Sequence, residues 1–160
     1  MNLYLQDFFS RSATDVKTIK QNIDRIRKKP PKNLDTKLHI LHDYYSEKIN
    51  CLDCAQCCKS ISPAVSYSDI ERLAKHLKTK TSHIIDSYFT IDSDNDYVFT
   101  SQPCPFLMDD NYCNIYTSRP RACKEYPHTD RRRAYQILQI HAKNIDLCPI
   151  VYQVFKNLQL

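Results

Sequence analysis

Glycine is completely absent from the 160 residues of this chain. Glycine normally occupies the turn and helix-end positions that require a positive φ angle, so other residues must take those positions here. Asparagine tolerates the left-handed region better than most residues. We therefore expect positive φ angles among the following residues: Asn33, Asn50, Asn95, Asn111 and Asn144.

Long apolar runs are also missing. No stretch approaches the roughly 18 apolar residues that span a bilayer. The opening MNLYLQDFFSRS has neither the basic start nor the apolar core of a signal peptide. We expect a cytoplasmic protein without a membrane partner, in a compartment that keeps thiols reduced.

The remaining composition is that of a folded protein. Apolar residues make up 42% of the chain and charged residues 26%, which is the ordinary globular range rather than the disordered one. A length of 160 residues suits one domain with a real core. We therefore expect a single domain over residues 1–160.

Helical periodicity dominates the first 50 residues. Ser12–Asp15 has the pattern of a capping box, and apolar residues at helical spacing follow it as far as Pro30-Pro31. A second helical pattern covers residues 33–49. These two helices are expected to form an antiparallel hairpin over residues 1–49.

The rest of the chain predicts shorter elements. Ser68–Glu71 predicts a capping box, Thr81 or Ser82 the start of a helix to Phe89, and residues 92–96 a turn. Short strands are expected at Tyr97–Thr100 and Phe106–Met108, and Asp109–Asn111 leads into Tyr112–Tyr116, where a small hairpin is expected. The remaining expected elements are a short helix with Thr117 or Ser118 as its cap and Pro120 in its first turn, a helix over 132–143, and a final helix over 150–160 after Pro149. The predicted fold class is mainly α with a small β-hairpin.

Eight cysteines are the most informative feature of the sequence. In a reducing compartment they indicate metal ligands rather than a disulfide framework, which would also have to select one of 105 pairings. A spacing of three residues lets two thiolates turn toward one metal, and eight thiolates suit two four-ligand sites. The candidate ligands are Cys51, Cys54, Cys57, Cys58, Cys104, Cys113, Cys123 and Cys148.

The identity of the metal stays open at this point. Four cysteines bind Zn²⁺ tetrahedrally in structural sites, but iron–sulfur clusters also take four cysteines. Cys51, Cys54 and Cys57 match the first three positions of the bacterial run C-x2-C-x2-C-x3-C-P. The fourth would be remote, and both Cys104 and Cys148 are followed by proline.

Positive charge collects beside the later cysteines. The net charge is +5, and residues 119–133 hold six bases and two acids. These bases could compensate the charge of a thiolate-bound metal, form a solvated helix face, or bind nucleic acid, since Arg131–Arg133 lies near Tyr126 and Tyr135. We favour charge compensation, so nucleic acid is a possible but not a favoured partner.

An enzymatic thiol is a further alternative. A reactive cysteine paired with His128 or His141 could act as a nucleophile, but nothing distinguishes one cysteine from the others. His39 and His42 lie three residues apart on a predicted helix and fit a surface equally well. The sequence therefore assigns no catalytic residue and leaves open whether the protein is an enzyme.

Three motifs in order resemble one known family. They are C-x2-C-x2-C-C at 51–58, Cys-Pro-Phe-Leu at 104–107, and CNIYTSRPRACKEYP at 113–127. This arrangement resembles the YkgJ-type CxxCxxCC proteins, which are described as zinc- or iron-chelating domains. The resemblance extends from about residue 50 to Pro149. It implies a metal-stabilised region over 50–149 in which the eight cysteines bind Zn²⁺ or Fe, the latter possibly as an iron–sulfur cluster.

The resemblance also assigns supporting residues. It implies that Arg119, Pro120, Tyr126 and Pro127 support the cysteines or the fold around them, so Arg119 and Tyr126 are candidate cofactor-binding residues. Tyr112, Tyr116 and Tyr126 are further candidates for shielding the metal. Family members often carry glycine near the position of Ala55, so the backbone of that loop is expected to differ here.

Two other roles follow from the same motifs. One is a zinc-stabilised interaction module with an unknown protein or small-molecule partner. The other is an accessory domain, because the flagellin lysine N-methylases contain this type of cysteine cluster. A complete methylase is not expected, since the chain has no glycine-rich cofactor loop and little sequence outside the cluster region.

Overall fold

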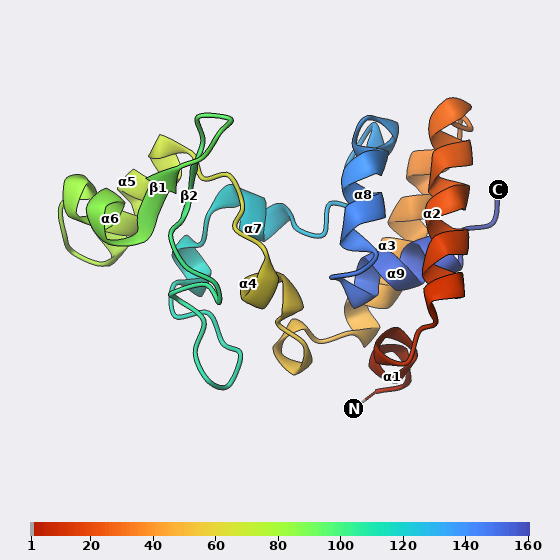
Figure 1. Ribbon diagram of the computed structural model, residues 1–160, viewed down its shortest axis with the longest axis horizontal. Helices are drawn as coiled ribbons and strands as arrows, with labels where there is room; N and C mark the ends of the chain where they lie inside the picture. The colour runs from red at the N-terminus through yellow and green to blue at the C-terminus, as the bar shows by residue number, and fades with distance from the viewer. Residues whose placement is uncertain (1) are drawn as a thin grey trace. The chain divides into compact units, whose positions relative to one another are not determined.

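The computed structural model describes residues 2–160 and divides them into two compact units (Figure 1). Unit 1 contains the described residues as far as Cys54 together with Pro127–Leu160, and unit 2 contains Ala55–Tyr126. The predicted boundaries near residues 49 and 149 differ from this division. Compact units can belong to one domain or to two, so the single domain stays a prediction.

Unit 1 is helical and joins the two ends of the sequence (Figure 1). Its principal helix pairs are α2 with α8 and α3 with α9, while α1 packs on α9. The consecutive helices α2 and α3 thus pack chiefly on helices from the C-terminal part of the chain, and their arrangement as an antiparallel hairpin stays a prediction. The elements are α1 Leu3–Phe9, α2 Ala13–Lys28, α3 Leu34–Lys48, η1 Cys51–Asp53, η3 Ala134–Ile137, α8 Leu138–Asn144 and α9 Pro149–Lys156.

The start of α2 is determined locally. Ser12 accepts a hydrogen bond from the Asp15 amide, and the Asp15 carboxylate accepts one from the Ser12 amide, so the predicted capping box is confirmed. Ile19, Ile23 and Ile26 then bury one face of the helix. This spacing leaves the lysines and arginines of α2 on the opposite, solvent-exposed face.

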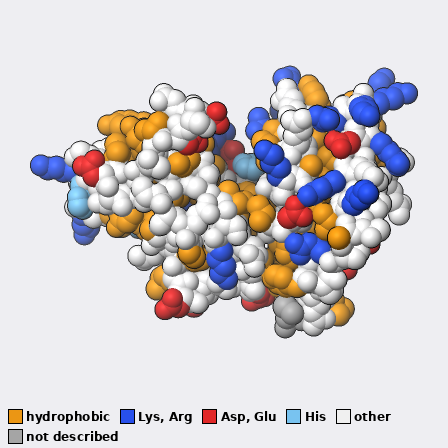
Figure 2. Space-filling model, viewed as in Figure 1, with side chains coloured by type: hydrophobic (Ala, Val, Ile, Leu, Met, Phe, Trp, Pro, Cys, Tyr) orange, Lys and Arg blue, Asp and Glu red, His pale blue; other side chains and the backbone are white. Residues whose placement is uncertain are grey.

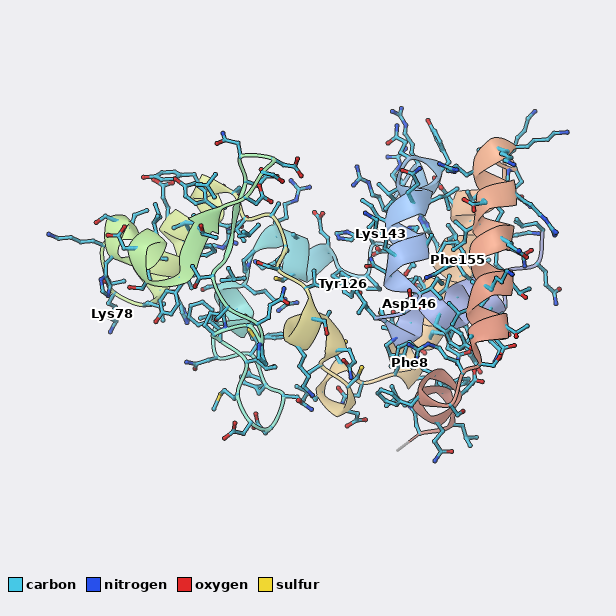
Figure 3. The ribbon with its side chains drawn as sticks, viewed as in Figure 1. Phe8, Lys78, Tyr126, Lys143, Asp146 and Phe155 are labelled. Carbon is cyan, nitrogen blue, oxygen red and sulfur yellow. The ribbon has the colours of Figure 1, made fainter. Side chains whose placement is uncertain are left out.

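The core of unit 1 is centred on α9. Pro149 occupies its first turn as predicted, and Val151, Tyr152 and Val154 are completely buried. Phe8 of α1 meets the Tyr152 ring edge-on, with centroids 5.8 Å apart (Figure 3 labels Phe8). Since α9 is buried nearly all round, it provides the surface on which the helices of the N-terminal part pack.

Ionic contacts fix the same helices at their surface. The Asp7 carboxylate accepts from Gln153 Nε2 and from Lys156 Nζ, each at 2.7 Å. Although burial acts to raise the pKa of Asp7, these hydrogen bonds hold it below its usual value. At the end of α8, Lys20 donates to the carboxylate of Asp146, which Figure 3 labels. The interactions connect α1 and α2 to the C-terminal segment.

Unit 2 combines short helices with a two-stranded antiparallel sheet (Figure 1). Ile70, Leu73, Ile84, Phe89 and Phe99 form the centre of its core. The mainly helical fold with a small β-hairpin is thus confirmed for the described residues. The elements are α4 Gln56–Ser60, α5 Tyr67–His76, α6 Thr81–Tyr88, β1 Phe89–Ile91, β2 Tyr97–Phe99, η2 Tyr116–Ser118 and α7 Arg121–Glu125.

The two-stranded sheet lies earlier in the sequence than the predicted hairpin. Tyr97–Phe99 is a strand as expected, and its partner is Phe89–Ile91, with Phe89 opposite Phe99. At the predicted hairpin, Phe106–Met108 forms no regular strand, but Leu107 and Cys113 make an isolated antiparallel bridge across Asp109–Asn111. The Phe89 and Phe99 rings stack with centroids 4.8 Å apart, and this buried cross-strand pair selects the partner.

Positive φ angles occur at only some of the expected asparagines. Asn95 and Asn111 have them, whereas Asn33 and Asn50 are at −97° and −83° and Asn144 lies in α8. The unexpected positions are Ala55, Lys78, His128 and Arg133. Asparagine therefore replaces glycine in the tight turns, while residues of other types take the helix ends.

Membrane-spanning helices are not found within residues 2–160. Each described helix is too short or too polar to cross a bilayer.

A buried histidine predicts acid sensitivity of unit 1. His141 of α8 is fully buried, and burial, assisted by the charge of His128, lowers its pKa to about 4. A histidine with a depressed folded pKa favours the folded state above its unfolded value of about 6.5, and this contribution is lost as the pH falls. We expect the free energy of unfolding to drop by about 2 kcal/mol between about pH 7 and pH 5. Urea titrations across this range measure it.

The matched variants are His141→Leu, which removes the buried imidazole, and His76→Gln, which removes an exposed one. His141→Leu should flatten the pH dependence, and His76→Gln should retain it. An unchanged slope in His141→Leu would contradict the assignment.

Candidate metal centre

The first cysteine motif is divided between the two units. Cys51 begins the turn η1, and the Cys54 amide closes it by donating to the Cys51 carbonyl at 3.1 Å. Both belong to unit 1, whereas Cys57 and Cys58 lie on α4 of unit 2. The cysteines of this motif thus lie on two consecutive elements: Cys51 and Cys54 on a 3₁₀ turn, and Cys57 and Cys58 on the short helix that follows it.

Ala55 separates these two turns in a left-handed conformation, with φ 51° and ψ 18°. This is the position near which the related proteins often carry glycine. A left-handed alanine costs roughly 1–2 kcal/mol. Ala55 therefore has a conformation that glycine adopts more easily, and a difference between this loop and that of related proteins stays a prediction.

Unit 2 brings the later cysteines toward α4. The Cys104 amide donates to the Cys58 carbonyl at 2.8 Å, which fixes the two chain segments side by side. The sulfurs of Cys57 and Cys58 are 3.9 Å apart. Residues separated by almost 50 positions thus meet at one end of α4.

In two tight turns, backbone amides donate hydrogen bonds to cysteine sulfurs. At Cys104, the Leu107 amide donates to the Cys104 carbonyl at 3.0 Å, and the amides of Phe106 and Leu107 also donate to the Cys104 sulfur. At Cys113, the Ile115 amide donates to the sulfur in the same way. N–H groups aimed at sulfur favour the thiolate form, which is the form that binds metals.

Four thiols interact electrostatically within unit 2. Burial raises the pKa of Cys123 to about 12, and the charges of Cys58, Cys104 and Cys113 add to this effect. Burial likewise raises the pKa of Cys104 and of Cys113, and in both cases the charge of Cys58 contributes. Mutual repulsion among buried thiolates is the cost that a bound cation removes. We call Cys58, Cys104, Cys113 and Cys123 the four-thiol cluster.

Cys58 is the exception among the four. The hydrogen bond with Cys57 lowers its pKa to about 7, against burial, and the charges of Arg119 and Lys59 act in the same direction. A pKa near 7 leaves much of this thiol deprotonated at neutral pH. Cys58 is therefore the thiolate to which a metal ion can add first.

Arg119 is the cation common to this cluster. Its charge lowers the pKa of Cys58, Cys113 and Cys123. A larger contribution comes from the hydrogen bond with Cys57 at Cys58, in the same direction, and from burial at Cys113 and Cys123, in the opposite direction. The guanidinium lies 3.7 Å from the centroid of the Tyr116 ring and donates to the Tyr116 carbonyl at 2.7 Å. These contacts hold Arg119 in place, and its role toward a bound metal stays a prediction.

The three candidate shielding tyrosines differ in position. Tyr112 and Tyr116 stack on each other with centroids 6.0 Å apart, and both remain about half exposed. Tyr126 follows α7, where its amide donates to the Ala122 carbonyl, and is partly buried (Figure 3). Their shielding of a metal stays a prediction.

Asp69 positions the segment that carries Arg119 and Cys123. Its buried carboxylate accepts from the Arg121 amide at 3.1 Å and from Arg72, and Arg72 also donates to the Arg119 carbonyl at 3.0 Å. Asp69 is at the same time the third helical residue of α5, in a capping box with Ser66. The box predicted at Ser68 and Glu71 is thus wrong by two residues, and no local sequence pattern indicates the long-range contact of Asp69.

Unit 1 contains the other predicted ligands outside α4. Cys51 is exposed, whereas Cys54 and Cys148 are buried, and the Cys148 amide donates to the Asn144 carbonyl at the start of α9. His42 Nδ1 lies 2.7 Å from the Thr129 hydroxyl in the same unit. The ligand role of these three cysteines stays a prediction.

Four cysteine sulfurs suit a metal ion that prefers sulfur ligands. Their positions in this structure are nevertheless not those of ligands around one ion. Within residues 2–160, no three His, Cys, Asp or Glu side chains are arranged to hold an ion. Tetrahedral Zn²⁺ requires four thiolate sulfurs at about 2.3 Å from one ion, and the sulfurs of the described residues do not surround a common point in this way. Metal binding would therefore deprotonate the cluster and contract it.

Comparison with known proteins gives one match. The model of the CxxCxxCC family, described as "Putative zinc- or iron-chelating domain", matches residues 50–148. No curated protein and no solved structure matches the chain. The matched residues include the whole of unit 2 and all eight cysteines.

Loss of the Asp69 carboxylate should destabilise unit 2. Because Asp69→Asn removes the charge from a buried hydrogen-bond network, we expect the free energy of unfolding to fall by about 2–4 kcal/mol. Thermal unfolding followed by circular dichroism measures the change. Asp86→Asn, an exposed substitution on α6, is the matched control. Equal melting of the two variants would show that Asp69 does not fix the segment from Arg119 to Cys123.

The metal-free protein should show a reactivity order among its thiols. Since the pKa of Cys58 is about 7 and that of Cys123 about 12, iodoacetamide should alkylate Cys58 fastest and Cys123 slowest near neutral pH. The rate at Cys58 should rise with pH to a plateau above about pH 8. Peptide mass spectrometry after timed alkylation follows each site, and equal rates at the two thiols would contradict the electrostatic assignment.

Proposed function

Because this chain belongs to the CxxCxxCC family, whose members are described as zinc- or iron-chelating domains, we propose that unit 2 binds a metal through the four-thiol cluster. The observation that carries the proposal is the electrostatic interaction of these four thiols with one another. Four half-buried cysteines from three separate chain segments act on one another's pKa. Zn²⁺ and Fe are the metals that four thiolates bind.

The surroundings of the cluster support binding of a cation by thiolates. Amides of Phe106, Leu107 and Ile115 donate to two of the sulfurs, and the charges of Arg119 and Lys59 act on Cys58. A divalent ion with four thiolates carries a formal charge of about −2. The two cations and the amide dipoles are of the sign that offsets this charge.

The proposed role of the metal is structural. Residues 100–126 contain only η2 and α7 as helices and contribute few residues to the core of unit 2. A closed four-thiolate site would join this segment to α4 and stabilise it. We propose Zn²⁺ as the ion on this basis, and a zinc-stabilised interaction module as the corresponding function.

Iron is the second candidate, because the family description includes it. The same four thiolates could hold a single iron or an iron–sulfur cluster, whose potential would then respond to the amide hydrogen bonds on the sulfurs. Cys51, Cys54, Cys57 and Cys148 lie outside the four-thiol cluster, and their role as metal ligands stays a prediction from the sequence. From the sequence alone we also propose two further properties. The protein could be an accessory domain related to lysine N-methylases, and it would lie in the cytoplasm, where thiols stay reduced.

The adjacent pair Cys57 and Cys58 offers a matched test. Both thiols lie on α4 and both are half-buried, but only Cys58 belongs to the four-thiol cluster. We expect Cys58→Ser, like serine variants of the other three, to lower metal affinity at least about tenfold. Cys57→Ser should retain the metal. Competition with a chromophoric chelator measures affinity, and metal analysis of protein purified without oxygen measures content.

The outcomes separate the alternatives. Zinc near one ion per chain, without visible absorption, supports the structural site, whereas iron with acid-labile sulfide supports a cluster. Equal metal loss in the Cys57 and Cys58 variants would contradict the four-thiol assignment. Unchanged metal content and melting in all four cluster variants would exclude metal binding by this cluster.

A further inference from the structure

Charge is distributed unequally between the two units. Unit 1 contains 15 Lys and Arg against 9 Asp and Glu, a formal charge of +6, whereas unit 2 contains 8 against 9 and carries −1. Bound thiolates would make unit 2 more negative still. The excess positive charge of the protein therefore lies in the unit that lacks the four-thiol cluster. It cannot be explained as a means of neutralising the negative charge of metal-bound thiolates in that cluster.

Tertiary structure gathers part of this charge at one end of unit 1. The Asp35 carboxylate, in the first turn of α3, accepts from the Arg133 amide at 2.6 Å and from the Ala134 amide at 2.9 Å. This fixes the arginine triplet Arg131–Arg133 beside the start of α3. The lysines of the segment that joins α2 to α3 precede Asp35 directly. We call the resulting set the basic end: Lys28, Lys29, Lys32, Arg131, Arg132 and Arg133.

The backbone holds the two parts of the basic end rigidly. Pro30-Pro31 restricts the connection between α2 and α3, and the Pro31 carbonyl accepts from the Leu34 amide at 3.1 Å. Arg133 has a left-handed conformation, at φ 58°, and its carbonyl accepts from the Gln136 amide. The six cations are thus presented by two fixed turns rather than by flexible segments.

None of the six cations forms an ion pair with the part of the chain that the structure describes, and all six are exposed. The nearby acids are engaged otherwise: Asp35 accepts the two amides, and Asp130 lies 3.8 Å from His42 Nε2. Figure 2 shows Lys and Arg side chains over much of the visible face of unit 1, several of them at the end where α2 finishes. Six unpaired cations on one small surface favour a polyanionic ligand.

An aromatic side chain stands in the same surface. Tyr135 follows the arginine triplet directly and is 48% exposed. Arginines that bind phosphates, beside an exposed ring on which a base can stack, are the combination that single-stranded nucleic acids recognise. An anionic membrane also attracts exposed cations, but the basic end has no aliphatic side chain whose insertion would strengthen such an attachment. We propose that the basic end binds the phosphate backbone of single-stranded nucleic acid, with Tyr135 as a stacking platform.

The test uses the full chain, purified with its metal, and a fluorescein-labelled single strand of about 20 nucleotides, as DNA and as RNA. Fluorescence anisotropy gives the dissociation constant at several salt concentrations from about 50 to 200 mM. If six phosphates are contacted, the logarithm of affinity should fall with the logarithm of salt concentration with a slope of about −4.

Paired variants identify the surface. Lys28→Gln with Lys29→Gln, and Arg131→Gln with Arg132→Gln, should each weaken binding about tenfold and reduce the slope by about 1.4. The control, Lys75→Gln with Lys80→Gln, removes two exposed cations from unit 2 and should change affinity less than about twofold. Circular dichroism and melting confirm that each variant is folded.

A second comparison isolates stacking. Tyr135→Ala should weaken binding without changing the salt slope, whereas Tyr67→Ala, which removes an exposed ring from unit 2, should have no effect. The proposal is overturned if the control double variant weakens binding as much as the other two, or if no binding occurs at low salt. Binding to phosphatidylserine vesicles with no binding to the oligonucleotides would also overturn it.

Discussion

The buried carboxylate of Asp69 is the contact on which the cysteine-bearing part of unit 2 depends. One oxygen receives the Arg121 amide and the Arg72 side chain, while the other completes the cap of α5 with Ser66. A charge this deeply buried is stable only when all its hydrogen-bonding capacity is used. Asp69 therefore joins a helix of the core to the segment that carries Arg119 and Cys123, and so determines where both side chains lie.

Two opposed effects act on the thiols that this segment brings together. Burial and mutual repulsion favour the protonated forms of Cys104, Cys113 and Cys123, whereas amide hydrogen bonds and Arg119 favour thiolates. Without a cation, burial prevails at these three, and only Cys58 is easily deprotonated. A bound metal ion would reverse the balance, because it supplies positive charge at the centre of the repulsion. In such a site, metal affinity and the stability of unit 2 are linked.

The helices of unit 1 depend on a different kind of contact. Its helices pack on α9, whose side chains are buried nearly all round, so the two ends of the sequence form one core. The outer surfaces of α2 and of the turns near Asp35 are then left to charged residues. The four-thiol cluster thus lies in the unit of nearly neutral charge, and the excess positive charge lies in the other unit.

The sequence by itself determined the features that depend on neighbouring residues: the capping box at Ser12, proline at the start of α9, and the cysteine motifs that identify the family. Each rests on contacts within about four positions of the chain. Only the tertiary structure decided which of two possible caps begins α5, because the choice of Ser66 with Asp69 is made by a partner some 50 residues away. It also decided that Phe89 pairs with Phe99, and that Asp35 brings the arginine triplet beside the lysines before α3, since long-range pairings follow from burial and hydrogen bonding rather than from local pattern.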